Sequence, residues 1–125
     1  MQSSLLLYIG SAITVMWGVA HLVPTKSVVT GFGAISQDNM RILTMEWIAE
    51  GLTLMFVGLL VFLVAVLGEP GSSTSLVVYW ATAVMLLSMA GLTLLTGART
   101  SILPMRVCPF VKASAAILIF VGTMV

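Results

Sequence analysis

Charge is scarce in this sequence. Its 125 residues include five Lys or Arg and four Asp or Glu, so 7% are charged while 60% are hydrophobic. Soluble domains carry about a quarter charged residues, and the polar surface left here is too small to keep a compact body in water. The composition therefore excludes a soluble globular enzyme and a disordered tail. A net charge of +1 without a basic patch also excludes a nucleic-acid partner.

Cysteine and histidine are almost absent as well. The single Cys108 excludes an internal disulfide and every multi-cysteine metal or redox motif. The single His21 excludes the paired Glu-x-x-His motifs of di-iron bundles and a two-histidine haem site. No glycine-rich phosphate loop or nucleophile elbow is present. We therefore assign no metal, and the sequence requires no cofactor.

Long apolar runs dominate what remains. About 20 helical residues cross the hydrocarbon core of a bilayer, and no run shows the alternation that a barrel strand needs. The first run has no positively charged start, so we expect a retained helix rather than a cleaved signal peptide. The chain is predicted to be one all-α domain, 1–125, an integral membrane four-helix bundle. Its predicted spans are 5–23, 42–67, 76–96 and 104–125.

The connections between the spans predict the orientation. Lys26 and Arg41 follow the first span, and Arg99 and Arg106 follow the third, so all four lie on one side. The opposite side holds the N-terminal tail and the connection with Glu69, neither with a Lys or Arg. The positive-inside rule then places both termini outside the cytoplasm of a multi-pass protein in the cell (inner) membrane.

Ionisable residues within the spans are the strongest functional signal. Glu46 and Glu50 lie four residues apart, so they project from one helix face. With His21 and Lys112, they fall at the cytoplasmic end of the predicted bundle. A charge at bilayer depth costs at least about 2.5–3.5 kcal/mol, so such residues usually face a bundle interior, a partner or a wet cavity. For Lys112 two alternatives stay open: an ion pair with Glu50, or a side chain that reaches the headgroups.

The other candidates have equally plain alternatives. Glu46 is either an interfacial carboxylate or part of a pocket, and His21 either bonds a loop carbonyl or transfers a proton. We expect Cys108 to be an inert packing residue. The connection over 25–41 is longer than most helix–helix loops, and we expect it in the interface or folded over the mouth of the bundle.

Small and hydroxylated residues form stripes along the predicted helices. Ser11, Thr14 and Gly18 lead to His21 at helical spacing, and Thr93 lies on a similar stripe of the third span. Such stripes allow close helix packing in membranes. Because they lead toward the ionisable residues, we predict a funnel that is polar at its cytoplasmic end and dry at its outer end.

The four spans also resemble a known family. The segment from Glu50 to Leu54, Glu-Gly-Leu-Thr-Leu, is followed by Gly58-Leu59-Leu60, and the first span bears glycines. This pattern resembles the DoxX-like group of small membrane proteins. The resemblance covers the architecture and the first two spans, and Glu50 is the residue that it marks. It implies a four-helix bundle and, for some members, a link to oxidoreductase complexes that pass electrons to quinone.

Three functions fit these observations. The first is binding or transport of a small amphiphilic or anionic ligand at the cytoplasmic end, where Arg99, Arg106 and Lys112 offer positive charge and Glu50 or His21 a proton. The second is a structural or assembly subunit of a membrane complex, or a homo-oligomer. The third is an intramembrane enzyme that moves a proton on a quinone- or isoprenoid-like lipid. The bilayer is a partner in all three, with a lipid-soluble molecule in the first and third.

Overall fold

The computed structural model describes residues 3–125, and in this part of the chain every regular element is a helix. Four helices are long and apolar enough to cross a membrane. They are α1 (Ser4–Leu22), α3 (Gln37–Leu67), α4 (Ser73–Leu95) and α5 (Leu103–Gly122). A short helix α2 (Thr25–Thr30) joins α1 to α3, and a 3-10 turn η1 (Gly97–Arg99) joins α4 to α5.

The helix boundaries differ from the predicted spans where polar caps extend the helices. α3 begins five residues before the predicted start because the Ser36 side chain accepts a hydrogen bond from the backbone N–H of Asn39. α4 begins three residues early because Ser72 does the same for Ser75. A hydropathy run locates the apolar part of a helix, and its capped polar turn lies outside that run.

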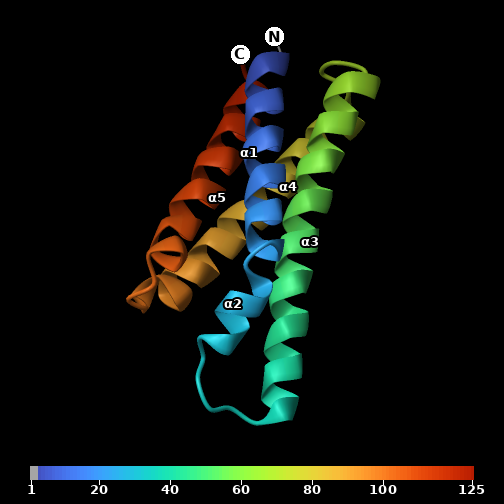
Figure 1. Ribbon diagram of the computed structural model, residues 1–125. Helices are drawn as coiled ribbons and strands as arrows, with labels where there is room; N and C mark the ends of the chain where they lie inside the picture. The colour runs from blue at the N-terminus through green and yellow to red at the C-terminus, as the bar shows by residue number, and fades with distance from the viewer. Residues whose placement is uncertain (1–2) are drawn as a thin grey trace.

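The helices form an antiparallel bundle in which α1 lies between α3 and α5 (Figure 1). α4 packs mainly against α5. The two ends of the described chain meet, because the N–H of Ser3 donates a hydrogen bond to the carbonyl of Gly122 at 2.8 Å. The connection between α3 and α4 lies at this end, while α2 and η1 lie at the other (Figure 1). The cationic connections are therefore gathered at one end of the bundle.

Glycine allows α1 and α3 to pack closely. A Cβ atom added at Gly18 would lie 2.7 Å from the carbonyl oxygen of Gly51 and 2.8 Å from the backbone nitrogen of Met55. A Cβ atom at Gly58 would lie 2.9 Å from the carbonyl oxygen of Ser11. Real Cβ atoms do not approach backbone this closely, so the two helices pack at this distance only because these positions lack side chains.

The outer surface of the bundle is strongly apolar. Large hydrophobic side chains such as Met16, Phe56, Leu92 and Phe110 are each more than 60% exposed, and they come from all four long helices. In contrast, several polar side chains are buried, namely Ser11, Thr14, His21, Thr82 and Lys112. This inverted pattern is what a lipid solvent favours.

Candidate functional site

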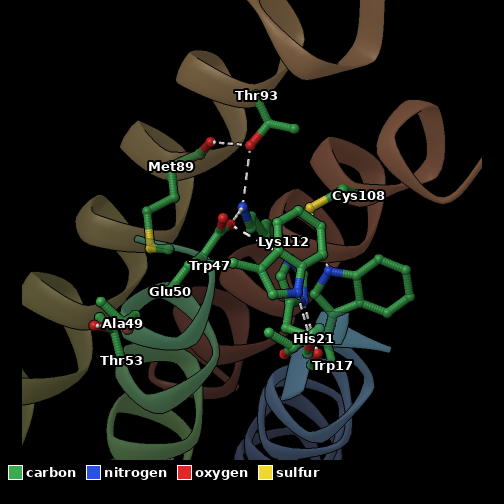
Figure 2. Close-up of polar contacts among 11 residues, drawn as sticks. Trp17, His21, Trp47, Ala49, Glu50, Thr53, Met89, Thr93, Cys108 and Lys112 are labelled. Carbon is green, nitrogen blue, oxygen red and sulfur yellow. Dashed lines mark hydrogen bonds and ion pairs between the residues drawn. The ribbon is translucent and has the colours of Figure 1, made fainter. Parts of the chain in front are cut away.

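One polar residue from each long helix meets the others at the end of the bundle that holds α2 and η1. They are His21 of α1, Glu50 of α3, Thr93 of α4 and Lys112 of α5, and we call them the polar cluster (Figure 2). The Gly18–Gly51 contact positions the first pair, since Gly18 lies one turn before His21 and Gly51 follows Glu50. On α5, the small residues Ala115 and Ala116 are buried next to Lys112 and let that helix approach the interior.

Lys112 is the centre of this cluster. Its side chain is about 1% exposed, and its ammonium group donates hydrogen bonds to Glu50 Oε1 and, at 3.0 Å, to Thr93 Oγ1. The Thr93 hydroxyl in turn donates to the carbonyl of Met89 at 2.8 Å. Of the two alternatives for Lys112, the structure shows the ion pair with Glu50. A buried ammonium needs such partners because its solvation by water is lost.

His21 lies on the other side of Glu50. Its Nε2 is 3.6 Å from Glu50 Oε1, and its Nδ1 is 2.9 Å from the carbonyl oxygen of Trp17. A carbonyl only accepts, so Nδ1 carries a hydrogen and Nε2 is the nitrogen that exchanges protons. The bond to a backbone carbonyl is one of the two alternatives predicted for this residue, although the carbonyl belongs to α1 itself rather than to a loop.

Two tryptophans hold the histidine in place. The Trp47 ring stacks on the imidazole with centroids 5.0 Å apart, and the Trp17 ring meets it edge-on at 5.8 Å. The Trp47 indole N–H also donates to the carbonyl of His21 at 2.6 Å, which satisfies a carbonyl at the end of α1. Figure 2 shows both indoles beside His21. The imidazole is thus fixed in its ring plane and in its tautomer.

Cys108 completes the group. It lies one turn before Lys112 on α5, is 2% exposed, and its Sγ accepts a hydrogen bond from the Trp17 indole at 3.3 Å. A nitrogen of His21, a carboxylate oxygen of Glu50 and Sγ of Cys108 all lie within 4.8 Å of one another. Such a set of donors is able to hold a metal ion. Here, however, Glu50 already accepts a hydrogen bond from the ammonium of Lys112, and a divalent metal ion would lie beside that ammonium, so we assign no metal to it.

A cavity of about 620 Å³ adjoins this group. His21, Cys108, Trp17 and Trp47 form its polar and aromatic side, and the rest of its lining comes from the end of α1, from α2 and Phe32, and from the start of α5. The lining residues are Trp17, Ala20, His21, Pro24, Ser27, Val28, Gly31, Phe32, Trp47, Ile102, Leu103, Pro104, Met105, Val107 and Cys108. The cavity is therefore bounded mostly by apolar side chains.

This lining corrects the predicted funnel. A polar mouth is expected from the sequence, but the cavity lining is mostly apolar and includes neither Glu50 nor Lys112. The connection over 25–41 folds over the end of the bundle, as one of its two alternatives predicts, and part of it forms α2 and lines the cavity.

Three candidate residues lie away from the cluster. Glu46 is exposed one turn from Glu50, and Arg99 and Arg106 are also exposed; none of the three lines the cavity. Their roles in ligand binding stay predictions. In contrast, His21, Glu50 and Lys112 are brought together, although they are scattered in the sequence.

Sequence reasoning missed the part played by Trp17, Trp47 and Cys108. Each of the three lies one turn before a residue of the polar cluster on the same helix, at i−4 from His21, i−3 from Glu50 and i−4 from Lys112. That spacing places each pair on one helix face. It is the signal from which these contacts could have been found.

Comparison of the chain with protein-family models, curated proteins and solved structures finds no match. The resemblance to DoxX-like proteins therefore stays a prediction, and function has to be argued from the site itself.

Proposed function

We propose that this chain is an integral membrane protein that binds a neutral amphiphile in the cavity beside His21. The membrane location is supported by four long apolar helices whose outer faces expose large hydrophobic side chains. The positive connections with Lys26, Arg41, Arg99 and Arg106 favour the cytoplasm for the cavity end, with both termini on the opposite side.

The observation that carries the binding proposal is the cavity itself. Its volume of about 620 Å³ lies in the range of small-molecule sites, which are mostly apolar with a few polar groups on one side. Here the apolar part is built from Val28, Phe32 and Leu103, and the polar side from His21. An aliphatic or isoprenoid chain fits the first part, and a hydroxyl or carbonyl head fits the second.

The charges argue for a neutral head rather than an anionic one. Arg99 and Arg106 do not line the cavity, and Lys112 is already paired with Glu50 in an ion pair. A carboxylate or phosphate would thus enter an apolar space without a free cation, at a cost of several kcal/mol. The structure favours the amphiphilic ligand among the ligands that the sequence suggests.

Tryptophan fluorescence provides the test, because two of the three tryptophans line the cavity. Trp17 and Trp47 adjoin it, whereas Trp80 bonds Thr123 near the opposite end. A brominated fatty alcohol, titrated into the protein in bilayers, should quench the fluorescence of the wild type saturably. The intensity lost at saturation should be the same in Trp80→Phe. Bromine quenches at short range, so a bound probe reports on the two cavity tryptophans.

A variant that fills the cavity distinguishes a probe bound in the cavity from a probe that is merely dissolved in the bilayer. Ala20 is exposed toward the cavity and lines it, so Ala20→Phe should abolish the saturable part of the quenching. Ala81 is exposed on α4 and does not line the cavity, so Ala81→Phe should behave as the wild type. Quenching that rises linearly with probe in every variant would reject the binding proposal.

The buried ion pair supports a second, structural role beside ligand binding. Among the described residues, every buried side-chain nitrogen or oxygen has a hydrogen-bond partner. The Glu50–Lys112–Thr93 contacts join three helices, so they fix the helix register whether or not the cavity is occupied.

A further inference from the structure

The only cysteine of the chain lies where a bound molecule would meet it. Cys108 lines the cavity together with His21, and the Trp17 indole N–H points to its sulfur at 3.3 Å. The packing role expected from the sequence does not account for an N–H donor and an imidazole beside one thiol. These neighbours are those of a nucleophilic cysteine.

The hydrogen bonds define which atom receives the thiol proton. Nδ1 of His21 already donates to the Trp17 carbonyl, so Nε2 is the ring nitrogen that is free to take a proton from Cys108. The sulfur, a ring nitrogen of His21 and an oxygen of Glu50 lie within 4.8 Å of one another. Nε2 is on the side of this group, since it lies 3.6 Å from Glu50 Oε1.

The surrounding charges stabilise the pair formed by proton transfer. The imidazolium of His21 would face the Glu50 carboxylate of α3 at 3.6 Å. The thiolate would accept the indole N–H of Trp17 and lie one turn from the ammonium of Lys112 on α5. The titratable groups that face the thiol from neighbouring helices are thus His21 and Glu50, with Lys112 on its own helix.

We propose that Cys108 and His21 form a nucleophilic pair that adds reversibly to a conjugated carbonyl compound bound in the cavity. The thiolate forms an S–C bond to the β-carbon while the C=C π bond breaks, and the resulting enolate takes the proton from His21 Nε2. The addition balances without an oxidant, a reductant or a leaving group. It rests on the proposed function, because the compound has to enter the apolar cavity.

The site favours this reaction class over acyl transfer. A tetrahedral acyl intermediate needs preorganised donors for its oxyanion. The two indole N–H groups are already engaged, that of Trp47 by the His21 carbonyl and that of Trp17 by Cys108. Conjugate addition instead places the negative charge several atoms from the sulfur, on an enolate that His21 neutralises by donating a proton. A soft thiolate also matches the polarisable β-carbon.

The experiment uses N-ethylmaleimide, a small apolar conjugate acceptor, on the full chain in bilayers. Because the chain has one cysteine, one mass increment reports Cys108 alone, and Cys108→Ser should show none. The reference is an exposed loop thiol, Ser101→Cys in the Cys108→Ser background. An ordinary thiol with a pKa of about 8.5 reacts about tenfold faster per pH unit between roughly pH 6 and 8.

We expect the rate at Cys108 to change less than about threefold over that range. His21→Gln should slow the reaction at about pH 6 at least tenfold and restore the slope of the loop thiol. A Cys108 rate that follows the slope of the loop thiol, or that His21→Gln leaves unchanged, would overturn the proposal. An unreactive Cys108 would overturn it as well.

The outcomes distinguish this proposal from the binding function. Saturable quenching by the brominated alcohol with an inert Cys108 retains the binding site and rejects the nucleophilic pair. A reactive Cys108 with a flat pH profile but without saturable quenching retains the nucleophilic thiol, and rejects both the amphiphile site and the addition to a compound bound there.

Discussion

Removing one member of the Glu50–Lys112 pair should destabilise the bundle far more than removing both. Glu50→Gln leaves the ammonium of Lys112 without its counter-ion at a position where its side chain is about 1% exposed. Breaking a buried pair in this way costs about 3–5 kcal/mol, because the remaining charge is desolvated and uncompensated. Thr93 still accepts one hydrogen bond, so the lower end of that range is expected.

Lys112→Met and the double variant show whether the cost comes from an unpaired charge or from the lost pair itself. Lys112→Met removes the ammonium and leaves the carboxylate, which is partly exposed and so better solvated; its side chain is 31% exposed. Its cost should therefore be smaller than that of Glu50→Gln. The double variant removes both charges and should be close to the wild type or within about 1–2 kcal/mol of it.

The assay is reversible unfolding in mixed micelles, followed by circular dichroism, with all variants measured under one condition. Glu46→Gln is the matched control, since this exposed carboxylate lies one turn away on the same helix. It should change the free energy of unfolding by less than about 0.5 kcal/mol. Equal effects of Glu50→Gln and Glu46→Gln, or additive effects of the two cluster substitutions, would show that the Glu50–Lys112 pair is not a buried, coupled pair.

Three further predictions concern packing, capping and orientation. Gly18→Val should separate α1 from α3 and lower the thermal unfolding temperature by several degrees. Gly91→Ala is the control, because an added Cβ there meets nothing within 4 Å, and it should be neutral or slightly stabilising. Equal unfolding temperatures of the two variants would reject the close contact between α1 and α3. Trp47→Phe keeps an aromatic ring but loses the 2.6 Å hydrogen bond to the His21 carbonyl at the end of α1, so it should lower the free energy of unfolding by about 1 kcal/mol. An unchanged free energy of unfolding would argue against that hydrogen bond. In a cysteine-free background, a cysteine at Ser72 should react with an impermeant maleimide from outside the cell and one at Thr100 only after lysis, and the reverse labelling would invert the proposed topology.

Much of the fold could be predicted because long apolar runs leave few structural choices. Helices satisfy their own backbone, so four long apolar runs predict four helices. Where boundaries shifted, a serine cap extended the helix beyond the apolar run, as Ser36 does for α3. The pairing of Lys112 with Glu50 was one of two alternatives, and its choice depended on how far α5 approaches α3, which a single sequence does not specify.

The cavity and its lining could not be predicted in the same way. They depend on α2, a short helix made up of polar and β-branched residues that resembles a loop in the sequence. They also depend on the angle at which α5 begins. Cys108 was expected to be inert because lone cysteines usually are. Its relation to His21 arises from tertiary contact between α1 and α5.

Magnetic resonance in bilayers can show whether the polar side chains of the four helices meet. The chain has two lysines, Lys26 and Lys112, so uniform lysine 15Nζ labelling gives two signals that are easily assigned. Combined with 13Cδ-labelled glutamate, it should show a strong dipolar coupling from Lys112 Nζ that Glu50→Gln abolishes and Glu46→Gln leaves intact. A Lys112 signal without coupling to glutamate, with the same water exchange as exposed Lys26, would contradict the account.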